Sequence, residues 1–260
     1  MFISVEDSAP CFKGFTLILP AVSVGNVGQL AVDLIVSTLN LQRVGYFHTD
    51  CLIPMVGNNP YSTSSEDSLQ LSTNAEVYWC KDLKLAVLQI RSPLIQTKTR
   101  SFRKMVVSWI KSSGFAKTVL LSSSHAYQRD DRQILGSPLR YLLTPALREQ
   151  VTALEQLGWT EMEKISAFPG VMDSDSQRLC IPGGGVTKAL YTDCCTEGVS
   201  MAVMLLFCSE GDNVPDAIAL ANHLNDWLHL LDPPAQGSVP WRIPSSWKLL
   251  FGSGVPPTIF

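Results

Sequence analysis

The sequence predicts an α/β fold of three layers, a sandwich in which helices cover both faces of a central β-sheet. Short apolar β-type runs alternate with amphipathic helical stretches along the 260 residues, and one hairpin interrupts this alternation. The first run, residues 15–19, precedes a helical pattern over residues 29–41 and a second strand over residues 43–47. These elements form a β–α–β unit at the start of the chain.

The middle of the chain adds the hairpin and a second strand–helix–strand passage. A polar, turn-rich stretch at residues 57–74 predicts a surface loop. The next β-type runs are separated by Lys81 and Asp82, which suit a hairpin turn. The expected bounds are 75–80 and 83–90 for the hairpin strands, 102–113 for a helix that stops at Gly114, and 118–121 for the next strand.

The second half predicts a buried strand and a long helix. The continuous apolar run at residues 200–208 is typical of a central parallel strand. Residues 212–231 form the clearest helix, with Pro215 in its first turn. Further elements are expected at 144–164 (helical, broken at Gly158), 179–181 (strand), 187–195 (helix) and 241–251 (short helix). We expect one domain over residues 1–251 and a flexible, glycine- and proline-rich tail over residues 252–260.

Composition restricts the class of protein. The net charge is −3 and no long basic stripe occurs, so nucleic acid is not an expected partner. The longest apolar run, residues 15–24, is about half a membrane span and contains Pro20, so no membrane partner is expected. The mean hydropathy of +0.15 is high for such a chain, which favours a generous core or an apolar face that a partner covers.

The seven cysteines indicate the compartment. Their spacing is irregular, their number is odd, and several lie in apolar runs, unlike a secreted disulfide framework. The N-terminus carries Glu6 and Asp7 where a secretory signal would carry basic residues. Free thiols in a reducing compartment are expected, so the predicted location is the cytoplasm and the nucleus.

Two glycine-rich loops leave an enzymatic alternative open. Residues 25–28 follow a strand and open a helix, where free amides can bind phosphate. Residues 183–185 enter another helix, and Lys188 could assist an anion there. Neither loop has the G-x-G-x-x-G or Gly-Lys-Ser/Thr pattern of a nucleotide site, so structural turns are favoured. The alternative is an enzyme acting on a nucleoside or a phosphorylated small molecule.

A hydrolase set and a metal site are the other candidates. Residues 122–125 read Ser-Ser-Ser-His at a strand end, with Asp130 and Asp131 close in sequence, but no G-x-S-x-G elbow supports a catalytic serine. Serines that bond a strand end are the simpler interpretation. The four histidines are scattered and no C-x-x-C occurs, so we expect no metal site and no cofactor.

The C-terminus offers large apolar groups for a partner. Trp241, Trp247 and Phe251 could anchor another protein or pack back on the core. The chain then ends in Thr258, Ile259 and Phe260. An apolar residue beside a free carboxylate suits a basic pocket, so these three residues are the predicted partner-binding site.

Five segments resemble the proteasome assembly chaperone family. They are residues 20–30 (PAVSVGNVGQL), 54–60 (PMVGNNP), 121–125 (LSSSH), 181–185 (IPGGG) and 243–247 (IPSSW). The resemblance runs nearly end to end, and the blocks are long enough to be specific.

The resemblance implies a chaperone without enzymatic activity and an α/β core similar to the nucleoside phosphorylase-like fold. It also implies a heterodimer with proteasome assembly chaperone 1. That dimer would scaffold the ring of α-subunits of the 20S proteasome and prevent its premature or off-pathway association. Related chaperones end in a hydrophobic-tyrosine-X motif that docks between α-subunits, and here Ile259 stands where the tyrosine would be.

Overall fold

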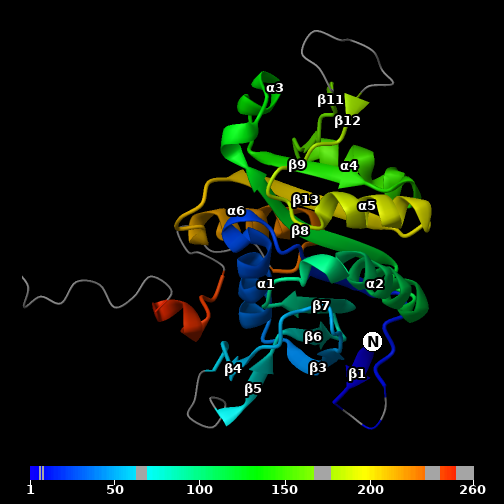
Figure 1. Ribbon diagram of the computed structural model, residues 1–260, viewed down its shortest axis with the longest axis vertical. Coiled ribbons are helices and arrows are strands. Elements are labelled where there is room, and N and C mark those ends of the chain that lie inside the picture. Colours follow the sequence, from blue (N-terminus) through cyan, green and yellow to red (C-terminus); the bar gives the residue numbers. More distant parts are fainter. Residues whose placement is uncertain (6, 8, 63–68, 167–176, 232–240, 250–260) are drawn as a thin grey trace, which may run out of the picture.

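A computed structural model describes residues 1–249 apart from 6, 8, 63–68, 167–176 and 232–240. Within this part of the chain, the main sheet has nine strands in the order β1-β3-β6-β7-β2-β8-β13-β9-β10. The strands are β1 Phe2–Ser4, β2 Thr16–Pro20, β3 Gln42–Phe47, β6 Ala75–Cys80, β7 Leu85–Ile90, β8 Lys117–His125, β9 Leu139–Leu143, β10 Thr160–Glu161 and β13 Met201–Cys208. Figure 1 shows this sheet running through the length of the molecule.

Strand direction divides the sheet into a parallel centre and antiparallel margins. Strands β7, β2, β8 and β13 are parallel, with Leu17 opposite Thr118 and Leu205 opposite Ser122. Strands β1, β3, β6 and β7 form antiparallel pairs on one side, and β9 runs antiparallel to β13 on the other. Both faces of the parallel centre must therefore be covered, as its continuous apolar sequence predicted.

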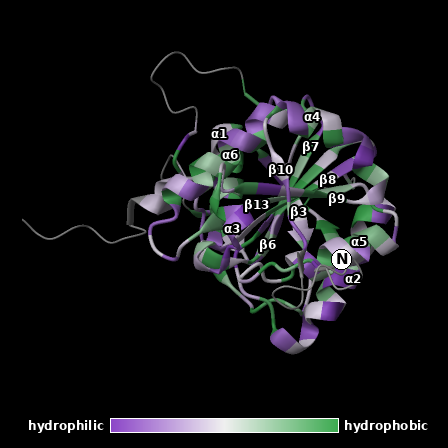
Figure 2. Cartoon of the chain, turned by 90° about the horizontal axis from the view of Figure 1, so that it is seen from above, coloured by the Kyte–Doolittle hydropathy of each residue, from purple (hydrophilic) through white to green (hydrophobic). Residues whose placement is uncertain are grey.

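Four helices provide that cover. Helices α1 Val27–Thr38 and α6 Val214–Leu228 pack on one face, and α2 Thr99–Ser113 and α5 Thr187–Thr196 pack on the other (Figure 2). Strand β13 serves both layers, because Met204 and Leu206 belong to the first core cluster while Val203 and Leu205 belong to the second. The predicted three-layer αβα sandwich is confirmed.

The remaining elements lie at the margins, and several differ from the expected ones. Most of the expected loop at residues 57–74 is flanked by two short paired strands, and in place of the expected strand at 179–181 a two-residue strand lies just before it and pairs with residues 165–166. These elements are α3 Asp131–Ile134, α4 Val151–Gln156, β4 Val56–Asn58, β5 Leu71–Thr73, β11 Ile165–Ser166 and β12 Gln177–Arg178. The expected helix at 241–251 is a shorter 3-10 helix, Ser245–Leu249, and the proposed boundary between residues 251 and 252 lies outside the described residues.

Two differences have a clear physical cause. Strand β9 was not predicted, because Arg140 is charged and yet almost wholly buried. Its guanidinium pairs with Glu163 at 2.9 Å and donates to the carbonyl oxygens of Ser137 and Leu139. The helix expected over residues 144–164 consists of a 3-10 turn and α4, after which Thr160 and Glu161 join the sheet edge.

Helix α1 lies unusually close to strand β8 because of Gly28. A Cβ atom at this position would clash with the carbonyl oxygen of Leu121, which is backbone and cannot move aside. Both residues belong to segments that resemble the chaperone family. The glycine at this position is therefore required by packing of the helix against the sheet.

We expect Gly28→Ala to lower the free energy of unfolding by about 2 kcal/mol, since overpacking against backbone forces the helix outward. A decrease in stability would be informative, because a Gly→Ala change in a helix with free space around it increases the free energy of unfolding by about 0.5–1 kcal/mol. Gly57→Ala is the matched control, since a Cβ there meets nothing within 4 Å. Chemical denaturation measures both variants, and equal stability of the two would contradict the close-packing argument.

Candidate functional site

The parallel strands β2, β8 and β13 end at one edge of the sheet, here called the carboxyl edge. Ligands bind at this edge in many open α/β enzymes. Here the serines predicted at the end of β8 are wholly buried. The hydroxyls of Ser23 and Ser123 lie 2.7 Å apart, and that of Ser122 lies 2.6 Å from the hydroxyl of Thr187. These hydroxyls join the end of β8 to the loop at Ser23 and to the first residue of α5.

The glycine-rich loop at residues 183–185 covers the same edge. The Val24 amide donates to the carbonyl oxygen of Gly183 at 2.8 Å, and the His125 amide donates to that of Pro182 at 3.0 Å. Gly185 has a φ of +56°, and a Cβ there would clash with the Val22 carbonyl oxygen. The glycines thus allow two loops to pack backbone against backbone, which agrees with the predicted structural turns.

The residues of the hydrolase alternative are not assembled into a relay. Within the described part of the chain, no hydrogen bond joins the His125 imidazole to a serine hydroxyl or an aspartate. Its ring instead lies beside Tyr127, with ring centroids 4.9 Å apart. Asp130 accepts from the Gln133 amide at 3.1 Å and so caps α3, while Asp131 lies in the first turn of that helix. These residues are close in the sequence because a helix, capped by Asp130, follows soon after the end of the strand.

A second cluster, which the sequence did not reveal, centres on Asp33 of α1. Its carboxylate accepts from the Arg91 guanidinium at 2.8 Å, the Gln89 amide at 2.6 Å and the Tyr61 hydroxyl at 2.7 Å. The Asp33 side chain is only 8% exposed and that of Arg91 16%. The one signal in the sequence is a carboxylate on the apolar face of a helix, a position that requires a partner when it is buried.

The neighbours of Asp33 respond to its charge. Burial raises the pKa of Tyr61 well above its ordinary value, and the adjacent Asp33 carboxylate raises it further. Burial acts to lower the pKa of Arg91, but the electrostatic interactions with Tyr61 and Asp33 outweigh it and hold that pKa above its ordinary value. The Arg91 guanidinium therefore keeps its positive charge near neutral pH, and Tyr61 remains a neutral hydrogen-bonding neighbour.

The C-terminal segment packs onto this cluster. The indole nitrogen of Trp247 donates to Asp33 at 3.5 Å, and Ser245 and Ser246 donate to the carbonyl oxygen of Pro60 at 3.1 and 3.2 Å. We call Asp33, Tyr61, Gln89, Arg91 and Trp247 the Asp33 anchor. Two of the family-like segments, residues 54–60 and 243–247, thus meet here in space although they are far apart in sequence.

The predicted partner-binding aromatics therefore divide. Trp241 and Trp247 are buried, and the Trp241 indole donates to Asn222 of α6 at 2.7 Å, so both pack back on the core. Phe251 and the predicted site at Thr258, Ile259 and Phe260 lie outside the described residues. The structure describes residues 241–249, the segment that precedes them in the sequence.

The cysteines are all free thiols. Burial raises the pKa of Cys194 to about 12 and that of Cys208 to about 11, so neither forms a reactive thiolate near neutral pH. Within the described residues, no group of three or more His, Cys, Asp or Glu side chains could hold a metal ion. No helix in that part of the chain is long and apolar enough to cross a membrane.

We expect Asp33→Asn to lower the free energy of unfolding by about 3 kcal/mol, because it leaves the Arg91 charge buried without its counter-ion. Asp50→Asn is the matched control, since Asp50 pairs with Lys98 at 2.6 Å but is 76% exposed. That variant should unfold at an almost unchanged denaturant concentration. A similar, small effect of both substitutions would show that the Asp33 anchor contributes no more than a surface ion pair.

Known proteins share both the sequence and the fold. The PAC2 family matches residues 17–232. The chain is 73% identical to "Proteasome assembly chaperone 2" of Danio rerio and 53% identical to the Homo sapiens protein of that name, with all of each chain covered.

Among solved structures, Pyrococcus furiosus PbaA, described as an archaeal homolog of proteasome-assembly chaperone, has a TM-score of 0.65 at 17% identity, covering 90% of this chain and 88% of that one. PbaB of the same organism, described as an archaeal proteasome activator, has a TM-score of 0.60 at 12% identity, covering 90% of each chain. These structures share the fold. Because the family match extends over most of the sequence and the curated relatives align over its full length, the chain belongs to the PAC2 family.

Proposed function

We propose that this chain is a proteasome assembly chaperone that acts through protein contacts and not through catalysis. The observation that carries the proposal is identity of 52–73% over the full chain to vertebrate proteins named proteasome assembly chaperone 2. More specifically, we propose that the chain forms a heterodimer with proteasome assembly chaperone 1. That dimer scaffolds the α-subunit ring of the 20S proteasome and prevents premature or off-pathway association.

The carboxyl edge supports a binding role. Its serine hydroxyls and its glycine loop bond to other parts of the same chain, so the groups that could receive a small molecule are already engaged. The rival function is an enzyme acting on a nucleoside or phosphorylated small molecule at the glycine loops. It would require Pro182 and Gly183 to leave their hydrogen bonds with the amides of His125 and Val24. The proposed chaperone needs no cofactor.

The Asp33 anchor supports a role for the C-terminus. It holds Trp247 against the body of the protein, and the chain continues from there towards Thr258, Ile259 and Phe260. A tail whose base is fixed loses less conformational freedom on binding than a tail that is free along its whole length. We propose that residues 252–260 form a flexible tail on a single domain of residues 1–251, and that its last three residues bind α-subunits. The seven free thiols support a location in the cytoplasm and nucleus.

Co-expression with chaperone 1 and α-subunits tests the proposal. We expect a 1:1 heterodimer that captures α-subunits, and deletion of residues 258–260 should weaken capture while the heterodimer persists. Ile259→Tyr is the matched gain-of-function variant, because it supplies the tyrosine that stands at this position in related tails. It should capture α-subunits more strongly than the wild-type chain.

These experiments test the binding role of the tail separately from the chaperone function. Unchanged capture after the deletion would refute the tail as a binding element and leave the heterodimer standing. Failure of the wild-type chain to co-purify with either chaperone 1 or α-subunits would refute the chaperone function itself. Size-exclusion chromatography with light scattering gives the stoichiometry in each case.

A further inference from the structure

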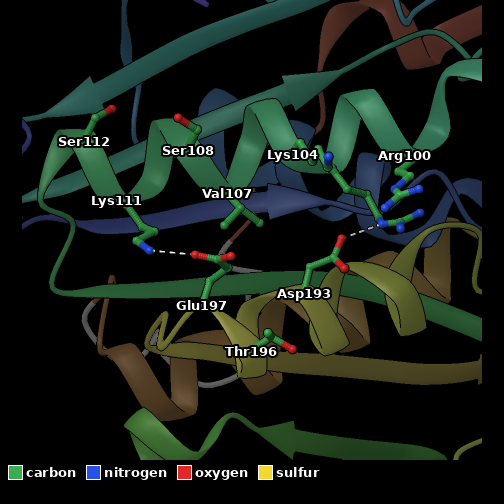
Figure 3. Close-up of a pocket in the computed structure, with 10 residues that line it drawn as sticks. Arg100, Lys104, Val107, Ser108, Lys111, Ser112, Asp193, Thr196 and Glu197 are labelled. Carbon is green, nitrogen blue, oxygen red and sulfur yellow. Dashed lines mark hydrogen bonds and ion pairs between the residues drawn. The ribbon is translucent and has the colours of Figure 1, made fainter.

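A groove runs between helices α2 and α5 on one face of the sandwich (Figure 3). Its volume is about 710 Å³. The side chains that line it come from one side of α2 and the facing side of α5, with the buried side chain of Val107 at its floor. We call it the α2–α5 groove. It lies away from the Asp33 anchor, which is on the α1 side of the sheet.

Two ion pairs hold the two walls together. The Arg103 guanidinium donates to Asp193 at 2.7 Å, and the Lys111 ammonium donates to Glu197 at 2.7 Å. Arg103 is only 17% exposed, so the first pair is partly shielded from solvent. These contacts engage both carboxylates of the groove with cations of the facing helix.

Two further cations in the groove have no such partner. Arg100 and Lys104 are exposed, lie one helical turn apart on α2, and form no ion pair within the described part of the chain. Helix α2 carries four basic residues and no acidic one, although the whole chain has a net charge of −3. This end of the groove is therefore a positive site on a negative protein, and like charges one turn apart repel unless an anion lies between them.

An apolar hollow lies on the other side of the same helix. It has a volume of about 470 Å³ and is lined by Met1, Phe2, Met105 and Trp109. Lys104, Ser108 and Ser112 line both this hollow and the α2–α5 groove, so only one ridge of α2 separates the two. Protein interfaces commonly combine an apolar centre with a charged rim, and these two hollows supply both.

We propose that this face of α2 is a docking surface for an acidic, amphipathic segment of a protein partner. Carboxylates of that segment pair with Arg100 and Lys104, its apolar side chains enter the hollow beside Met105, and the hydroxyls of Ser108 and Ser112 bond its polar groups. Nucleic acid fits less well, because the hollow beside Lys104 is lined mainly by apolar groups, which suit the apolar side chains of a protein segment and not a phosphate backbone. The proposal concerns α2 and α5 and does not depend on the binding role proposed for the tail.

A short fluorescent peptide of alternating glutamate and leucine is the probe, with its lysine–leucine counterpart and an oligothymidylate as comparisons. Fluorescence anisotropy at low ionic strength should show binding of the acidic peptide to the full chain, and added salt should weaken it. The Arg100→Glu/Lys104→Glu variant should bind it about tenfold more weakly or worse, a change of about 1.4 kcal/mol. Arg100→Gln/Lys104→Gln should fall between the two.

Lys84→Glu/Lys164→Glu is the matched control, because it changes the net charge equally at exposed lysines outside the groove. Its affinity for the acidic peptide should remain within about twofold of the wild-type value, which is a difference of under 0.5 kcal/mol. Equal loss of acidic-peptide affinity in the Arg100→Glu/Lys104→Glu and Lys84→Glu/Lys164→Glu variants would show that only the net charge matters, and would overturn the proposal. So would the absence of acidic-peptide binding by the wild-type chain. Tighter binding of the oligothymidylate, lost in the Arg100/Lys104 variant, would replace the protein partner with nucleic acid.

Discussion

The buried carboxylate of Asp33 is the interaction on which the arrangement of this protein depends. It joins four parts of the chain that are distant in sequence: α1, the end of β7 with Arg91, the loop at Tyr61 and the C-terminal segment at Trp247. A carboxylate in this position is costly unless several donors satisfy it, and each of the other three parts supplies at least one. The buried charge therefore links the C-terminal segment to the body of the protein.

The carboxyl edge of the sheet, where α/β enzymes bind their ligands, is filled by the chain itself in this protein. In open α/β folds this edge is free to bind ligands, but here Gly185 and Gly28 allow loop and helix to approach backbone so closely that the chain fills its own edge. The serines at the end of β8 complete the closure with hydrogen bonds to Ser23 and Thr187. What remains available to other molecules is the outer surface, including the positive side of α2.

Periodicity and turn residues were sufficient to predict the layers, the hairpin and the buried strand β13, because these depend on the local pattern of apolar residues. They failed at β9, because an arginine such as Arg140 is expected at the surface, and its ion pair with Glu163 forms only in the folded chain. The Asp33 anchor was missed for the same reason, since its partners Tyr61, Arg91 and Trp247 come together only in the folded chain. The glycine loops were correctly interpreted as turns, but the sequence could not say that the loop at residues 183–185 packs on residues 22–24. Single charged residues in apolar patterns were the signals that mattered most.

The groups at the carboxyl edge are engaged by the chain itself, so proteins rather than small molecules are the expected partners. Thermal unfolding in the presence of nucleosides, nucleotides and inorganic phosphate measures whether that edge binds a small molecule. A ligand at 100 times its Kd stabilises the folded state by about 2.7 kcal/mol, which is readily seen as a rise in Tm. The closed edge predicts no rise with any of these molecules. A concentration-dependent rise that persists in the Arg100→Gln/Lys104→Gln variant would show that a small molecule binds away from the positive side of α2, and would contradict a closed edge.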